Sequence, residues 1–145
     1  MFKHILLPTD GSSLSEAAIQ KSISLDRELG AKVTGLYVIP EYHTITLQAE
    51  MLTDTDEDFA KFGLTQATQF LDIIEKEART AGVPFTAVHA TSDHPYEAII
   101  QAAKDLKCDL ITMASHGRKG VHGLLIGSET QKVLVHSTIP VLVYR

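Results

Sequence analysis

The chain has 145 residues, of which 44% are hydrophobic and 21% are charged, and its formal net charge is −5. This size and composition predict one globular domain spanning residues 1–145 and exclude a disordered, collagen-like or coiled-coil chain. The acidic balance argues against DNA or RNA as a partner, the lack of an apolar run of about 20 residues argues against a membrane span, and the lone Cys108 favours a cytoplasmic protein without disulfides.

Two predicted strands flank the first predicted helix. The apolar run 2–8 predicts a buried strand that ends in a Pro-Thr-Asp-Gly turn. A capping-box sequence that begins at Ser13 predicts the start of a helix, which the spacing of apolar residues carries to Leu29 and which Gly30 ends. The β-branched and aromatic stretch 32–38 predicts the next strand.

The middle of the chain predicts one long helix. Residues 41–53 have no clean period and are expected to form a loop or a poorly defined helix start. A second capping-box sequence begins at Asp54, and the apolar residues that follow, Phe62 among them, predict a long helix that Gly82 ends. Gly63 is expected to weaken this helix by roughly 1 kcal/mol relative to alanine.

The remaining residues continue the alternation of strands and helices. Strands are predicted at 85–90, 109–114 and 140–144, and helices after Pro95 and at 128–136. Apolar strands that alternate with helices are typical of an α/β fold, in which helices cover both faces of a parallel sheet. Because crossovers are right-handed, the layout is expected to be a doubly wound domain of Rossmann-like or flavodoxin-like type.

The loop 115–128 concentrates glycine and positive charge. Free backbone N–H groups at the start of the helix that follows, with Arg118 and Lys119 nearby, favour the binding of an anion such as phosphate. The loop is neither a Walker A sequence nor a G-x-G-x-x-G fingerprint. A flexible surface loop that uses glycine for turn geometry is the alternative interpretation. Four of the nine glycines of the chain lie in it, namely Gly117, Gly120, Gly123 and Gly127.

The same loop carries a family resemblance. Ser-His-Gly-Arg-Lys-Gly at 115–120, with Leu-Leu-Ile-Gly-Ser at 124–128, resembles the universal stress protein family. The segments 5–12 and 139–145 are similar to the opening strand and turn of the family and to its closing strand. The resemblance implies a doubly wound, five-stranded parallel sheet in the order 3-2-1-4-5, within a three-layer sandwich of the adenine nucleotide alpha hydrolase-like type. Ligands would bind beyond the carboxyl ends of the first and fourth strands.

The ATP-binding branch of this family has the pattern G-x2-G-x9-G-[S/T]. Gly117 matches its second glycine, and Gly127 with Ser128 matches its end, but Ala114 stands at the first glycine position. An added methyl group can obstruct a close backbone approach. Glu129 is a second departure, because a carboxylate repels a polyphosphate unless it points outward or complements the helix N-terminus.

The resemblance implies roles for the site residues. Met113 and Ala114 would line the nucleoside pocket. Phosphates would be bound by Gly117, Gly127, Ser128 and Thr130. Asp10 would accept hydrogen bonds from adenine or ribose, or serve only the turn before the first helix, and Val38 would offer backbone groups to adenine. His116 would contact ribose or phosphate, or form a structural hydrogen bond. The predicted nucleotide-binding residues are Pro8, Thr9, Asp10, Val38, Met113, Ala114, His116, Gly117, Gly127, Ser128, Glu129 and Thr130. No side-chain metal site is predicted, and Mg or Mn would accompany the triphosphate.

The closing strand is the predicted partner surface. The resemblance implies a homodimer in which Val141, Leu142, Val143 and Tyr144 pair with the same strand of a second copy. The expected function is that of an ATP-binding, nucleotide-linked regulator or stress-resistance factor with no predicted catalytic residue and at most slow ATP hydrolysis. Two alternatives stay open: a family member that does not bind ATP and works through protein contacts, and an adenylyl-transfer enzyme. The sequence does not identify client proteins.

Overall fold

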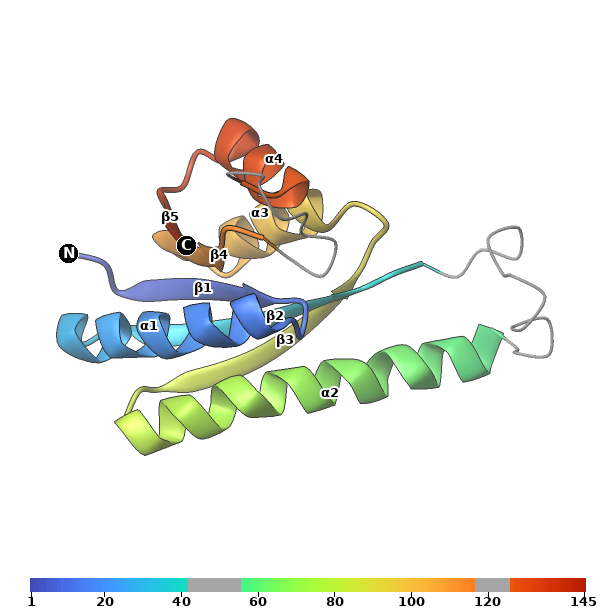
Figure 1. The fold of residues 1–145 in the computed structure, drawn as a ribbon, viewed down its shortest axis with the longest axis horizontal. Coiled ribbons are helices and arrows are strands. Elements are labelled where there is room, and N and C mark those ends of the chain that lie inside the picture. Colours follow the sequence, from blue (N-terminus) through green and yellow to red (C-terminus); the bar gives the residue numbers. More distant parts are fainter. Residues whose placement is uncertain (42–55, 117–125) are drawn as a thin grey trace.

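Strands and helices alternate along the part of the chain that the computed structural model describes, which is residues 1–41, 56–116 and 126–145 (Figure 1). The expected loop at 41–53, apart from Glu41, and the capping box at Asp54 lie outside these residues, as do 117–125 of the glycine loop. The elements are β1 (His4–Thr9), α1 (Ser13–Leu29), β2 (Lys32–Ile39), α2 (Asp56–Ala81), β3 (Phe85–Thr91), α3 (Pro95–Asp105), β4 (Leu110–Ala114), α4 (Ser128–His136) and β5 (Val141–Tyr144).

These strands form one parallel sheet in the order β3-β2-β1-β4-β5. β1 lies in the centre, with Leu6 opposite Thr34 of β2 and Ile111 of β4. β3 and β5 are the two edges. The doubly wound α/β fold and the strand order that the family resemblance implies are therefore confirmed. No helix among the described residues is long and apolar enough to cross a membrane.

Successive side chains of the central strand enter different cores. Leu7 packs with residues of α1 and α2 such as Ile19 and Ile74, whereas Leu6 packs with residues of α3 and α4 such as Ile99 and Val133. Because neighbouring residues of a strand point to opposite faces of a sheet, α1 and α2 cover one face and α3 and α4 cover the other. This layering places the ends of β1 and β4 between helices that lie on opposite faces (Figure 1).

The ends of two helices match the sequence only in part. Gly30 ends α1 with a positive φ of 63°, as predicted, and its N–H group donates to Arg27 O. At the other end the N-cap is Ser12 rather than Ser13, because Ser12 has the extended backbone of a cap and its hydroxyl accepts from Ser15 N. Ser13 is the first residue of the helix. The predicted capping box is therefore one residue out of place.

Gly63 of α2 is buried, whereas the neighbouring Phe62 is exposed. A Cβ atom on Gly63 would lie 2.5 Å from Cγ2 of Ile39, so the glycine lets α2 approach β2 closely. Phe62, one of the apolar residues of the predicted helix, is 59% exposed. The buried stripe of α2 passes instead through Gly63, Ala67 and Leu71.

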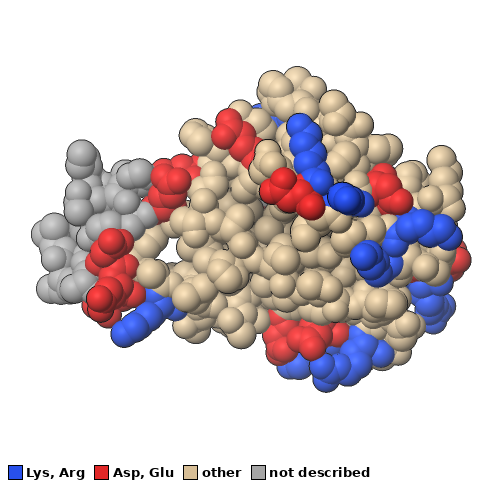
Figure 2. Space-filling model, turned by 180° about the vertical axis from the view of Figure 1, so that it is seen from behind, with Lys and Arg blue, Asp and Glu red and all other residues tan. Residues whose placement is uncertain are grey.

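Charged side chains of both signs are interspersed on the surface, as Figure 2 shows for one face. On α2, Lys76 pairs with Asp72 at 3.0 Å, and Arg79 pairs with Glu75 at 2.7 Å. Exposed pairs of this kind contribute about 1 kcal/mol or less. The fold therefore depends on its apolar cores much more than on these ion pairs.

Asp26 is an ionisable residue that lies in the interior rather than on the surface. Its side chain on α1 is fully buried, and neither carboxylate oxygen has a hydrogen-bond partner among the described residues. Ser22, also buried on α1, donates instead to Thr112 of β4. Burial raises the pKa of Asp26 from 3.8 to about 7, and Asp26 in turn helps to raise the pKa of Tyr144 on β5, for which burial is the larger cause.

This buried carboxyl predicts a pH-dependent stability. Between pH 4 and pH 7 the unfolded chain loses the Asp26 proton while the folded chain keeps it, so the free energy of unfolding falls as pH rises and levels off above pH 7. Asp26→Asn removes this cost. At 1.36 kcal/mol for each pKa unit, the variant gains up to about 4 kcal/mol at pH 8 and little at pH 4.

Urea unfolding followed by circular dichroism at pH 4, 6 and 8 measures this gain. Glu28→Gln, an exposed neutralisation on the same helix, is the control and is expected to change the stability by less than about 0.5 kcal/mol. An Asp26→Asn variant that is stabilised equally at all three pH values, or destabilised at pH 8, would contradict the explanation.

Candidate functional site

The candidate site lies where the order of the sheet reverses. β1 pairs with β4 on one side and with β2 on the other, so the chain returns to the middle of the sheet after building one half of it. α1 follows β1 on one face, and α4 follows β4 on the other. In open α/β sheets of this kind, ligands bind in the crevice beyond the carboxyl ends of the two strands.

Hydrogen bonds within the turn after β1 hold it in place. Thr9 is buried, and its hydroxyl oxygen accepts from Gly11 N at 3.2 Å and from the Ser15 hydroxyl at 2.9 Å. Oδ1 of Asp10 accepts from Ser12 N at 2.9 Å. Asp10 therefore serves the turn before α1, which the sequence offered as its alternative role, and Thr9 acts within the same turn.

The Phe70 ring of α2 packs against this turn. Gly11 has a φ of +79°, and a Cβ atom at this position would lie 2.4 Å from the Phe70 ring. Phe70 also packs on the Tyr37 ring of β2, with ring centroids 5.5 Å apart. Glycine is needed here for both its backbone conformation and its small size. Sequence reasoning did not identify Phe70 as a neighbour of the site, because the two residues are far apart in the chain.

The backbone joins the end of β4 to the start of α4. Gly127 N donates to Ser115 O at 2.6 Å, and the Thr130 hydroxyl donates to Ala114 O at 3.0 Å. A Cβ atom on Gly127 would lie 3.1 Å from that same Ser115 oxygen, so a larger residue would displace this oxygen by a few tenths of an ångström. The predicted residues Ala114, Gly127, Ser128 and Thr130 are thus brought together.

Two polar features of this junction fit an anion. Gly127 is the N-cap of α4, and among the described residues no side chain caps the first N–H groups of this helix, which suit an anionic acceptor. Nδ1 of His116 lies 3.1 Å from the Ser115 hydroxyl, and its buried Nε2 atom has no hydrogen-bond partner among the described residues. The buried Thr130 hydroxyl is already in use, so its predicted contact with phosphate stays a prediction.

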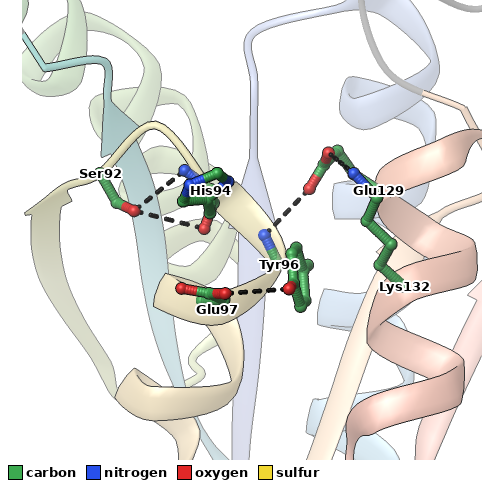
Figure 3. A network of polar contacts seen from close by, with 6 residues as sticks. All are labelled: Ser92, His94, Tyr96, Glu97, Glu129 and Lys132. Carbon is green, nitrogen blue, oxygen red and sulfur yellow. Dashed lines mark hydrogen bonds and ion pairs between the residues drawn. The ribbon is translucent and has the colours of Figure 1, made fainter.

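Glu129 turns toward α3 (Figure 3). Its Oε2 atom accepts from Tyr96 N at 3.0 Å in the first turn of α3, where His94 provides no side-chain cap, and its Oε1 atom lies 3.3 Å from Nζ of Lys132. Glu129 therefore complements a helix N-terminus, but that of α3 rather than of its own helix. Sequence reasoning could not find this contact, because Glu129 and Tyr96 lie 33 residues apart.

The remaining predicted residues are Pro8, Val38, Met113 and Gly117. Met113 is buried in β4 and packs with the α3 and α4 core, which Val38 of β2 also joins. The pairing of β1 with β2 ends at Thr9 and Tyr37, so Val38 lies one residue beyond the paired segment. Pro8 lies opposite Leu36 within that segment. Gly117 lies outside the described residues. Among the residues described, no group of three or more His, Cys, Asp or Glu could hold a metal ion.

The predicted dimer residues form β5 at an edge of the sheet. Leu142 is 37% exposed, and Leu134 and Val135 of α4 are also exposed. Ser115 N donates to Tyr144 O, so the last residue of β5 is held at the carboxyl end of β4. No other strand of the described residues lies on the outer side of β5, so the strand offers an edge and an apolar side chain.

Known proteins resemble this chain over its whole length. The universal stress protein family matches residues 1–145. A universal stress protein of Thermus aquaticus is 31% identical over 149 residues, which cover 100% of both chains. Universal stress protein MJ0577 of Methanocaldococcus jannaschii is 31% identical over 156 residues, which cover 100% of this chain and 96% of that protein.

Solved structures show the same fold. That of MJ0577 has a TM-score of 0.83 at 29% identity and covers 99% of this chain and 95% of its own. A universal stress protein from Archaeoglobus fulgidus in complex with dAMP has a TM-score of 0.70 at 16% identity and covers 100% of this chain and 98% of its own. With this fold and the match over the full sequence, the chain belongs to the universal stress protein family.

Proposed function

We propose that this universal stress protein binds ATP in the crevice between the ends of β1 and β4 and acts in the cytoplasm as a nucleotide-linked regulator or stress-resistance factor. The observation that carries the proposal is the start of α4, where Gly127 is held against Ser115 and leaves the N-terminal N–H groups of the helix without a side-chain cap. Such groups, with the positive end of the helix dipole, favour phosphate.

The two sides of the crevice would take different parts of the nucleotide. Adenine and ribose would lie against Asp10, the backbone of Val38, and the residues that end β1 and β4. The phosphates would lie over Gly127 and Ser128, with His116 Nε2 as a further hydrogen-bonding atom. Mg or Mn would then be held by the triphosphate rather than by a cluster of protein side chains.

Two observations support this assignment and one counts against it. The Glu129 carboxylate, which would repel a triphosphate, is engaged with Tyr96 and Lys132. A structural neighbour from Archaeoglobus fulgidus contains dAMP, also an adenine nucleotide. Ala114, in place of the glycine of the ATP-binding pattern, favours the second candidate function, in which the protein binds no ATP and acts through protein contacts.

Gly127→Glu tests the phosphate position. The new carboxylate would lie at the anion site, so the affinity for magnesium-ATP, measured by calorimetry, is expected to fall at least 100-fold, with the circular dichroism spectrum unchanged. Gln131→Glu adds the same charge to an exposed position of α4 and is the control, for which a change below threefold is expected. Equal ATP affinity of the Gly127→Glu variant and the wild type would contradict the proposed position.

Glu129→Gln tests the direction of the Glu129 side chain. The amide oxygen keeps an acceptor for Tyr96 N but removes the negative charge. Because the carboxylate faces α3 in the structure, the affinity for ATP is expected to change by less than threefold. An increase of tenfold or more would mean that the carboxylate faces the phosphates when ATP binds.

We also propose that the protein is a homodimer that pairs through β5. A free strand edge with an exposed apolar side chain favours pairing with a second copy. Leu142→Lys is expected to give a monomer in sedimentation equilibrium, because the interface would then bury two ammonium groups. Phe62→Lys changes an apolar side chain that is more exposed, on α2, and is expected to leave a dimer. A dimeric Leu142→Lys protein would contradict the β5 interface.

A further inference from the structure

A groove lies beside the other edge of the sheet, between β3 and α3. Its volume is about 540 Å³, and its lining includes Val88 and Ala90 from β3, Leu36 from β2, and Ala98 and Ala102 from α3. α3 and α4 cover the middle of this face, and β3 lies at its margin. The floor of the groove is therefore apolar and lies next to a sheet edge.

The helix side of the groove is acidic. Glu97, Gln101 and Asp105 follow one another at intervals of four residues, so they form one row along α3, and all three line the groove. Oε1 of Glu97 accepts from the Tyr96 hydroxyl at 2.9 Å (Figure 3), and Oδ1 of Asp105 accepts from Gln101 at 2.7 Å. No Lys or Arg is among the described residues that line the groove. The exposed carboxylates thus give it a negative charge.

The strand side offers backbone groups. β3 pairs with β2 in parallel register from Phe85 to Thr91, and no other strand of the described sheet lies on its outer side. A strand edge of this kind presents a row of N–H and C=O groups to any extended chain that comes alongside it. Recognition by strand addition uses such an edge for affinity and the neighbouring side-chain pockets for specificity.

We propose that this groove docks an extended, Lys- or Arg-rich segment of a partner protein, which adds to β3 as a further strand and places its cations beside Glu97 and Asp105. Side chains of an extended segment alternate between two faces. The basic set would face α3, where the aliphatic parts of its side chains would lie on the apolar floor and their charges would reach the acidic row. The other set would face the α2 side of the sheet. This surface is separate from the proposed nucleotide site and from β5, so it is independent of both.

A basic peptide of alternating lysine and valine, eight residues long and capped at both ends, is the probe. Its titration into the 15N-labelled protein is expected to shift the amide signals of 85–92 and 97–106 in a saturable way. The affinity of the peptide is expected to fall as salt is added. The same peptide with glutamate in place of lysine tests the charge. A basic peptide N-methylated at every residue has no N–H group to donate to the strand edge and tests the backbone contribution. Both are expected to bind at least tenfold more weakly.

A charge-reversal variant tests whether the basic peptide binds in this groove or is attracted to the acidic protein as a whole. The double variant Glu97→Lys, Asp105→Lys is expected to lose its affinity for the basic peptide and to bind the glutamate peptide instead. Glu16→Lys with Glu28→Lys makes the same change in net charge on α1, on the opposite face of the sheet, and is expected to keep the wild-type preference. The proposal is overturned if the basic peptide shifts no signals in the two segments, or if both double variants respond alike.

Discussion

The parallel pairing of β1 with β4 is the constraint on which the rest of the molecule depends. With β2 on the other side of β1, this pairing makes the sheet grow outward in two directions and sends α1 and α4 to opposite faces. The ends of β1 and β4 then lie next to each other, between helices that cover opposite faces of the sheet. The buried Leu6 and Leu7, one on each face, hold both layers to the same strand.

α4, the helix after β4, links the candidate site to α3. Gly127 lies within hydrogen-bonding distance of Ser115, and no side chain of the described residues caps the first N–H groups of α4. Two residues further on, Glu129 caps α3 instead of its own helix. Thus a carboxylate that is close in sequence to the candidate phosphate site stabilises a neighbouring helix, and that helix also forms one wall of the groove beside β3.

Much of the fold could be predicted from the sequence because apolar strands and helical spacing are local signals. The turn after β1, the proline in the first turn of α3 and the glycine that ends α1 were all visible in this way. Strand order was not, because periodicity does not encode which strands pair, and it came only from the family resemblance. The N-cap of α1 was misplaced because Ser12 and Ser13 are both good caps, and only the backbone conformation distinguishes them.

The backbone features of the candidate site could be predicted from the sequence better than its side-chain contacts. The glycine positions indicated a close approach, and Gly127 does lie against Ser115. The contacts of Glu129 with Tyr96 and of Gly11 with Phe70 join residues far apart in the chain. The burial of Asp26 was equally hidden, since an aspartate within a helical pattern is ordinarily expected on the solvent side.

The most direct test of the account follows the backbone amides at the start of α4 during nucleotide addition. In 15N-labelled protein with magnesium, ATP is expected to shift the amide signals of Gly127, Ser128 and Glu129 in a saturable way. Adenosine, which lacks phosphates, is expected to shift signals near Asp10 and Val38 while leaving those three almost unchanged. If millimolar ATP leaves the three amides unshifted, or if adenosine moves them as far as ATP does, the helix start is not a phosphate site.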